Sequence, residues 1–152
     1  MQEITLFLIV ITSGFSIYAW SAPHIIDKYV FNPYKITVNK QYYRLITSGF
    51  IHSDWMHLIF NMISLLSFGG FVEYYFSQIF GPLKGGFLFI GLYLAGLVLS
   101  DLYVIVKDSK DRYFNSLGAS GAISAVIFSA ILFDPLIGIR MFFIPIDIPG
   151  FI

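Results

Sequence analysis

The chain has 152 residues, of which 57% are hydrophobic and only 12% are charged, and nine basic side chains balance nine acidic ones. Soluble domains carry about 25% charged residues, so this composition excludes a disordered chain and argues against an ordinary soluble domain. The balanced charge gives no indication of a nucleic-acid partner. The apolar residues are clustered in long runs, which predicts that lipid is the solvent for most of the chain.

Four apolar segments are long enough to predict membrane spans, at about residues 4–21, 55–80, 83–106 and 117–133. The first segment has no charged residue from Ile4 to Trp20, and Trp20 is typical of a membrane interface. A cleaved signal peptide is the alternative interpretation, but no Lys or Arg precedes this apolar run. Asp101, near the end of the third segment, is expected to reach water.

The segments between and after these spans differ in character. Residues 22–54 mix prolines and lysines with many aromatic side chains, which predicts a folded loop at the membrane surface. Residues 135–152 are apolar but interrupted by Pro145, Asp147 and Pro149, and we expect a loop that leads into a further span. Because the sequence stops at what resembles the start of a helix, we expect a fragment of a longer protein.

The expected fold is therefore a single all-α membrane domain over residues 1–152. It is a polytopic helical bundle with four spans and the start of a fifth. The chain has no cysteine and only three histidines, His24, His52 and His57. The spacing of His52 and His57 does not match a helical zinc pair, and no carboxylate completes a ligand set. We expect no metal and no cofactor.

His57 and Asn61 are polar residues four positions apart in the second predicted span, so they share one helix face. Both side chains can donate hydrogen bonds, and two converging donors on a buried face could stabilise an oxyanion. The alternative is structural, because membrane helices often use such side chains for hydrogen bonds to neighbouring helices.

Ser120 lies in the stretch Gly118-Ala119-Ser120-Gly121, at the start of the fourth predicted span. A serine at a helix N-terminus is a possible nucleophile, because free backbone N–H groups there favour anionic species. The Gly-x-Ser-x-Gly pattern of soluble hydrolases is not met, since residue 122 is alanine. The small residues also fit close helix packing, through the pairs Gly118/Ala122 and Gly121/Ala125.

Taken together, four stretches resemble the rhomboid family of intramembrane serine proteases. They are Tyr43-Arg44-Leu45-Ile46-Thr47, His52-x4-His57-x3-Asn61, Phe68-Gly69-Gly70-x2-Glu73 and Gly118-Ala119-Ser120-Gly121-Ala122. The resemblance runs from about residue 41 to residue 134, and it depends on the order and spacing of all four stretches.

The resemblance implies a role for each matching residue. Ser120 would be the nucleophile, and His57 and Asn61 would line the oxyanion hole together with the backbone N–H of Ser120. His52 would belong to a polar network behind the site. Arg44 and Glu73 would be structural residues that hold the first loop and its neighbours. Gly118 and Gly121 would permit the tight geometry around the serine.

The implied activity is that of an intramembrane serine endopeptidase, which hydrolyses peptide bonds in or near transmembrane segments through an acyl-enzyme. Its partners would be membrane-protein substrates and the lipid bilayer, with no nucleic acid. The family's general base is a histidine on a later span, yet no histidine follows Ser120 in this sequence. A serine is a poor nucleophile without a base, so we expect this chain alone to be inactive. The alternative function is a non-catalytic rhomboid-like module that binds membrane-protein clients.

The resemblance also implies a multi-pass protein of the bacterial inner membrane, but two indications of its orientation disagree. The first loop has four basic residues and the third has three, whereas Lys84 and Arg140 are alone in the segments on the opposite side. The positive-inside rule would place the first and third loops in the cytoplasm. The usual bacterial arrangement of the family places them outside.

Overall fold

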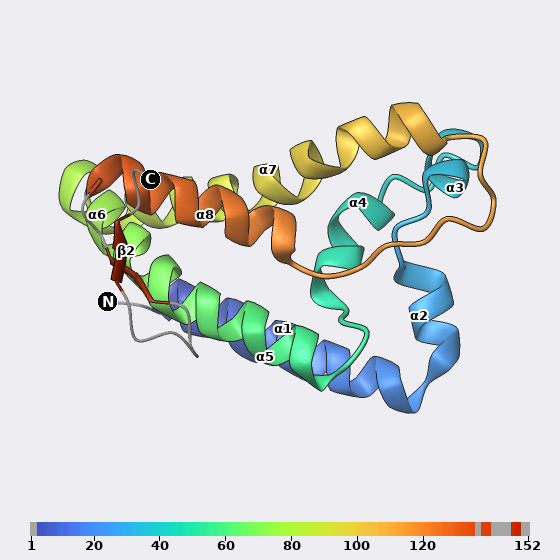
Figure 1. Ribbon diagram of the computed structural model, residues 1–152, viewed down its shortest axis with the longest axis horizontal. Coiled ribbons are helices and arrows are strands. Elements are labelled where there is room, and N and C mark those ends of the chain that lie inside the picture. The colour runs from blue at the N-terminus through green and yellow to red at the C-terminus, as the bar shows by residue number, and fades with distance from the viewer. Residues whose placement is uncertain (1–2, 136–137, 141–146, 150–152) are drawn as a thin grey trace.

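The computed structural model describes residues 3–135, 138–140 and 147–149, and most of this chain is helical (Figure 1). Its elements are α1 (Glu3–Ser21), α2 (Pro23–Tyr29), α3 (Pro33–Thr37), α4 (Arg44–Thr47), a 3-10 turn (Ser48–Phe50), α5 (Trp55–Ser64), a π-helical segment (Leu65–Gly69), α6 (Gly70–Phe80), α7 (Pro82–Asp108), α8 (Ser120–Phe133), β1 (Gly138–Arg140) and β2 (Asp147–Pro149). Within the described residues, three helical stretches are long and apolar enough to cross a membrane: Glu3–Ser21, Trp55–Phe80 and Pro82–Asp108. The fold is thus a helical membrane protein with three candidate spans.

The fourth predicted span is shorter than expected. Helix α8 begins at Ser120 and has 14 residues, which is about 21 Å against a bilayer core of about 30 Å. The cause is Gly118, whose φ of 113° lies outside the helical region and favours glycine. The expected count of four spans is therefore not confirmed; the described residues have three candidate spans and one shorter apolar helix.

The segment after α8 contains two short strands where we expected only a loop. Strands β1 and β2 pair antiparallel, with Ile139 opposite Ile148. Residues 150–152, where the sequence predicts the start of a further span, lie outside the described residues.

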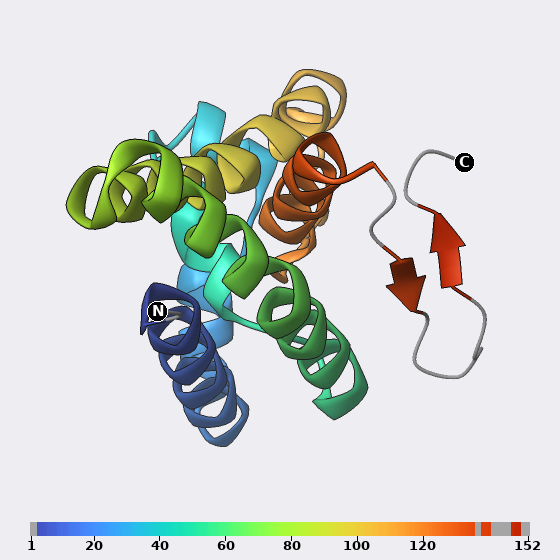
Figure 2. The ribbon, with the colours of Figure 1, turned by 90° about the vertical axis from the view of Figure 1, so that its left-hand side faces the viewer.

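The long helices form two groups that meet at one end of the molecule. Helices α1 and α5 lie side by side in the lower half of Figure 1, and α7 and α8 lie side by side in the upper half. Helix α6 contacts both α7 and α8 and closes that end of the bundle, as the end-on view in Figure 2 also shows. The short helices α2, α3 and α4 gather at the opposite end (Figure 1). Buried side chains from both groups form one core, including Leu8, Leu58, Phe89 and Val126.

Helices α7 and α8 approach closely because small residues face one another at their contact. A Cβ atom on Gly96 of α7 would lie 2.8 Å from Cα of Ala122 and 2.9 Å from Cβ of Ala125. A Cβ on Gly121 would meet the side chain of Ser100. Small side chains permit this approach between membrane helices. The packing interpretation thus holds for Gly121, Ala122 and Ala125, whereas Gly118 lies against His57. This packing sets the start of α8 beside Ser100.

Residues 22–54 are folded around Arg44, which is only 3% exposed. Its guanidinium donates to the backbone carbonyls of Val30 at 2.7 Å and Asp27 at 3.1 Å, and to Oε1 of Gln41 at 2.7 Å. A buried cation requires such partners. Arg44 is therefore a structural residue of this segment, as the resemblance implied.

Asn32 ties this segment to the connection between α7 and α8. It is 1% exposed, and its side-chain N–H groups donate to the carbonyls of Arg112 at 3.1 Å and Phe114 at 3.0 Å. Phe31 and Ser116 also exchange backbone hydrogen bonds of 3.0 and 3.1 Å. These contacts fix the chain that leads into Ser120.

Glu73 holds the start of α1 from across the bundle. The carboxyl group is 5% exposed, and it accepts hydrogen bonds from N of Ile4 at 3.1 Å, N of Thr5 at 2.9 Å and Oγ1 of Thr5 at 2.7 Å. The first N–H groups of a helix have no partner within the helix. Glu73 therefore caps α1 and joins the first candidate span to the second.

We expect Glu73→Gln to lower the free energy of unfolding by about 1–3 kcal/mol, because the amide cannot accept all three hydrogen bonds and leaves buried donors unpaired. Unfolding followed in detergent measures this change. The control is Glu3→Gln, which makes the same change at an exposed position of α1 and should have little effect. Equal stability of both variants would remove Glu73 from this structural role.

Candidate active site

Ser120 is the first residue of α8, and its side chain is exposed. Within the described residues its hydroxyl has no hydrogen-bond partner. The backbone N–H groups of Ser120, Gly121 and Ala122 also lack an acceptor there, because the first helical hydrogen bond runs from Ile123 to Ala119 at 3.0 Å. Unpaired N–H groups at a helix N-terminus favour negative charge. The serine thus lies where an anionic intermediate could be stabilised.

The ring of His57 packs directly against the turn before Ser120. A Cβ atom on Gly118 would lie only 2.6 Å from both Cε1 and Nε2 of His57. Gly118 is therefore required twice, by its positive φ and by its contact with the imidazole. The structure thus brings His57 of α5 against the turn that immediately precedes Ser120 and α8.

The orientation of His57 is fixed by two residues that the sequence analysis did not single out. Ser53 Oγ donates to Asp54 Oδ2 at 2.6 Å and lies 3.1 Å from Nδ1 of His57. Because the Ser53 hydrogen is used on the carboxylate, Nδ1 of His57 must donate to Ser53. Asp54 also caps α5 by accepting from N of His57 at 2.9 Å. The hydrogen bond from Ser53 lowers the pKa of Asp54 most, and the one from N of His57 lowers it further.

His52 is fully buried between α1 and the start of α8. Its Nε2 accepts from N of Ala119 at 3.4 Å, so Nδ1 carries the hydrogen and donates to Oγ of Ser16 at 3.1 Å. Ser16 in turn donates to the carbonyl of Phe50 at 3.1 Å. Burial first, then the neighbouring His57, lower the pKa of His52 to about 4. His52 is therefore a neutral support behind the serine turn.

Asn61 is 8% exposed and lies one helical turn after His57. One of its side-chain N–H groups donates to the carbonyl of His57 at 2.9 Å. The second N–H remains available for another acceptor. Within the described residues no hydrogen bond joins Asn61 to Ser120. Of the three proposed site residues, Asn61 is the one whose approach to the serine the structure does not record.

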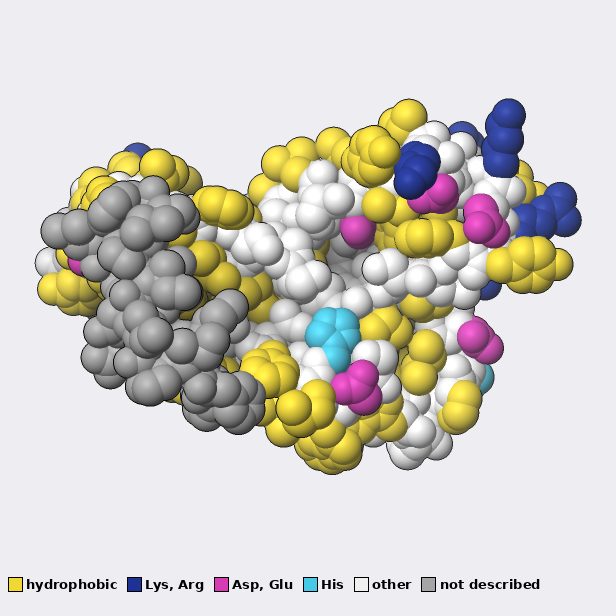
Figure 3. All heavy atoms as spheres, in the orientation of Figure 1, with side chains coloured by type: hydrophobic (Ala, Val, Ile, Leu, Met, Phe, Trp, Pro, Cys, Tyr) yellow, Lys and Arg dark blue, Asp and Glu magenta, His cyan; other side chains and the backbone are white. Residues whose placement is uncertain are grey.

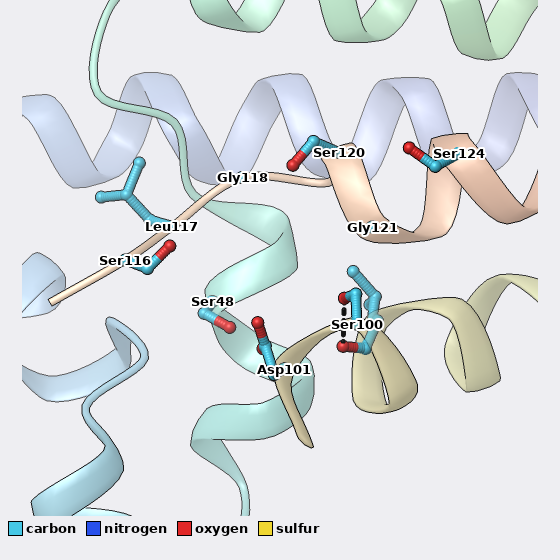
Figure 4. Close-up of a pocket in the computed structure, with 10 residues that line it drawn as sticks. Ser48, Ser100, Asp101, Ser116, Leu117, Gly118, Ser120, Gly121 and Ser124 are labelled. Atoms are coloured by element: carbon cyan, nitrogen blue, oxygen red, sulfur yellow. Dashed lines mark hydrogen bonds between the residues drawn. The ribbon is translucent and has the colours of Figure 1, made fainter. Parts of the chain in front are cut away.

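A polar pocket of about 230 Å³ opens beside Ser120 (Figure 4). Ser120, Gly121 and Ser124 of α8 form one side, Leu97, Ser100 and Asp101 of α7 form another, and Ser48 and residues 116–118 complete it. Figure 3 shows this face of the molecule hollowed between the two groups of helices, with backbone and side chains that are neither hydrophobic nor charged in the hollow and an acidic side chain at its margin. Such a hollow would let water and polar groups reach the serine.

Several lining residues were missed from the sequence. Ser48 and Ser100 lie far apart in the chain and carry no recognisable pattern. Asp101, which we expected to reach water, also lines the pocket. Asp54 had a usable signal, because an aspartate three residues before His57 fits a helix N-cap. No group of three or more metal-binding side chains occurs in the described part of the chain.

Comparison with protein-family models gives a match to the rhomboid domain over residues 39–152. The chain belongs to the rhomboid family. No curated protein matches the chain. The matched range of this rhomboid protein includes Arg44, His52, His57, Glu73 and Ser120, so the structural supports and the serine turn all lie within the rhomboid domain.

The buried, neutral His52 predicts a pH-dependent contribution to stability. In the unfolded chain a histidine binds a proton below about pH 6.5, whereas folded His52 does so only near pH 4. Between about pH 6.5 and pH 4 the unfolded chain therefore binds more protons than the folded one, so protons favour unfolding. The stability that neutral His52 contributes is complete above about pH 6.5 and is lost as the pH falls to about 4.

We expect the stability difference between the parent protein and His52→Asn to shrink from about pH 7.5 to about pH 4.5, as measured by thermal unfolding in detergent. The matched control is His24→Asn, because His24 is exposed and should show no such trend. A difference that is independent of pH would contradict a neutral, buried His52.

Proposed function

We propose that this rhomboid protein is an intramembrane serine endopeptidase with Ser120 as its nucleophile. The observation that carries the proposal is the position of the Ser120 hydroxyl, which is unpaired among the described residues and opens into a polar pocket within an otherwise apolar helical protein. Polar groups placed inside membrane helices are costly and usually functional. The family match supports a protease-like function for such a serine.

The reaction would begin with attack of Ser120 Oγ on a substrate carbonyl, which gives a tetrahedral intermediate with a negative oxygen. The backbone N–H of Ser120 and the side chain of Asn61 would donate hydrogen bonds to this oxygen. His57 would line the oxyanion hole through Nε2, since its Nδ1 is held by Ser53. The bond between the carbonyl carbon and the amide nitrogen would then break, and the amine would leave with the proton released from Ser120 Oγ. Water would hydrolyse the resulting acyl-enzyme to the free acid and regenerate the Ser120 hydroxyl.

The proposal assigns no general base among the described residues. His52 uses both ring nitrogens for hydrogen bonds within the chain, and using His57 as the base would remove a donor from the oxyanion hole. The substrates are proposed to be proteins with a transmembrane segment, and the location a bacterial inner membrane. The bilayer would deliver such substrates along the membrane plane to the pocket.

We expect Ser120→Ala to abolish cleavage of a membrane-anchored reporter by the full-length protein in its own membrane. The reason is the loss of the oxygen atom that would form the acyl-enzyme. Cleavage is measured by the appearance of a released reporter fragment. The control is Ser129→Ala, which makes the same change on the same helix outside the pocket and should retain activity.

Retained cleavage by Ser120→Ala would remove this serine from the mechanism. If the parent protein captures the reporter but does not cleave it, the alternative of a non-catalytic module that binds membrane-protein clients would be supported instead.

Asn61→Ala tests the oxyanion hole. We expect kcat for the same reporter to fall by about 10²–10³, because one donor to the transition state is lost while substrate binding is little changed. Asn39→Ala, at an exposed position in the first loop, provides the control. If the change raised KM and left kcat intact, Asn61 would be a packing residue rather than an oxyanion donor.

A further inference from the structure

The carboxylate of Asp101 is the unexplained charge in the pocket beside Ser120. Asp101 belongs to α7, one of the candidate spans, and its side chain points into the same space as Ser48 and Ser120 (Figure 4). It is half-buried, and it forms no hydrogen bond or ion pair with any residue that the structure describes. Acidic side chains within membrane helices are costly and usually pair with another group. This carboxylate therefore calls for a partner that is not one of the described residues.

The chemistry of the pocket defines that partner. Asp101 is the one charged side chain among its described lining residues, and the other polar side chains are the hydroxyls of Ser48, Ser100, Ser116, Ser120 and Ser124. A lone carboxylate surrounded by neutral hydroxyls favours a cation and opposes an anion. An ammonium or guanidinium group has several N–H donors and no acceptor, which matches a carboxylate and hydroxyl oxygens.

The size and the apolar wall of the pocket point to one side chain rather than a free molecule. The volume of about 230 Å³ is below the range of about 300–1,000 Å³ that is usual for small-molecule sites. Leu97 and Leu117 also line the pocket. The methylene stem of a lysine or arginine packs well on such apolar surface while its charged end stays among polar groups.

We propose that this pocket binds a lysine or arginine side chain of the membrane protein whose backbone lies against Ser120. The inference rests on the proposed function for its substrate, and it makes Asp101 a specificity-determining residue. A basic side chain near the cleaved bond would be selected by Asp101, an alanine would be accepted without that gain, and a glutamate would be repelled.

Binding can be measured without cleavage by using Ser120→Ala protein in lipid vesicles. The ligands are apolar transmembrane peptides of about 22 residues that differ only in carrying Lys, Gln, Ala or Glu near the membrane depth of Asp101. Energy transfer between labelled protein and labelled peptide reports binding. Close charge pairs at interfaces couple strongly, so we expect the Lys peptide to bind at least about tenfold more tightly than the Ala peptide, and the Glu peptide to bind more weakly than both.

Variants at Asp101 test the origin of this preference. Asp101→Asn should bring the binding affinities of the Lys and Ala peptides to within about twofold of each other. Asp101→Lys should make the Glu peptide the one that binds most tightly. The matched control is Asp108→Asn, which removes a carboxylate from the same helix outside the pocket lining and should keep the tenfold preference.

Equal binding of the Lys and Ala peptides by the protein with Asp101 intact would overturn the proposal, whether or not the Asp101 variants fold. Retention of the preference in Asp101→Asn would overturn it as well. Reporter cleavage separates this inference from the proposed function. Cleavage without a Lys preference would defeat the pocket assignment alone, whereas a Lys preference without cleavage would leave the pocket in place and defeat the protease activity.

Discussion

The turn at Gly118 and Ala119 is the contact on which the rest of the site depends. Gly118 adopts a positive φ, donates its N–H to the carbonyl of Ser48 at 3.0 Å and lies against the ring of His57. Ala119 donates to Nε2 of His52 at 3.4 Å. These contacts decide that α8 starts at Ser120, and they hold its unpaired N–H groups beside the pocket. A side chain at residue 118 would disturb both the backbone and the imidazole.

The buried charged side chains among the described residues have hydrogen-bond partners within the chain, so a half-buried charge without a partner is unusual here. Arg44 is surrounded by carbonyl oxygens and an amide, and Glu73 accepts three hydrogen bonds from the start of α1. These pairings join segments that are distant in the sequence and leave no group free for chemistry. Asp101 forms no hydrogen bond or ion pair among the described residues, and it lines the same pocket as Ser120. The structure thus separates residues that hold the fold from residues that line an open pocket.

Much of the fold follows from apolar runs, because a helix is the one local structure that satisfies its backbone in lipid. The helical membrane character was therefore predictable, and the chain belongs to the family whose motifs it resembles. The length of α8 was not predictable in this way, because hydropathy treats Gly118 as one more small residue, whereas its positive φ prevents the helix from starting earlier in the chain. The strands β1 and β2 were also missed, since an apolar stretch with prolines carries no clear period.

The candidate site was only partly readable from the sequence. Ser120 and His57 could be singled out because polar residues are rare in apolar spans. Ser48, Ser100 and Asp101 could not, because their proximity arises from packing of α7 against α8 and from the fold of residues 22–54. The hydrogen bond that His57 donates to Ser53 could not be predicted either. Its direction depends on where the Ser53 hydroxyl hydrogen points, and the bond from Ser53 to Asp54 decides that.

If this turn makes Ser120 a reactive nucleophile, a reagent for reactive serines should form a covalent adduct with it. The full-length protein in its membrane is treated with a serine-directed fluorophosphonate, and the modified residue is located by mass spectrometry of its peptides. We predict modification at Ser120, with none at Ser124 or Ser100, and loss of modification in Gly118→Ala. An unmodified Ser120, or equal modification of the pocket serines, would show that the turn does not make Ser120 a reactive nucleophile.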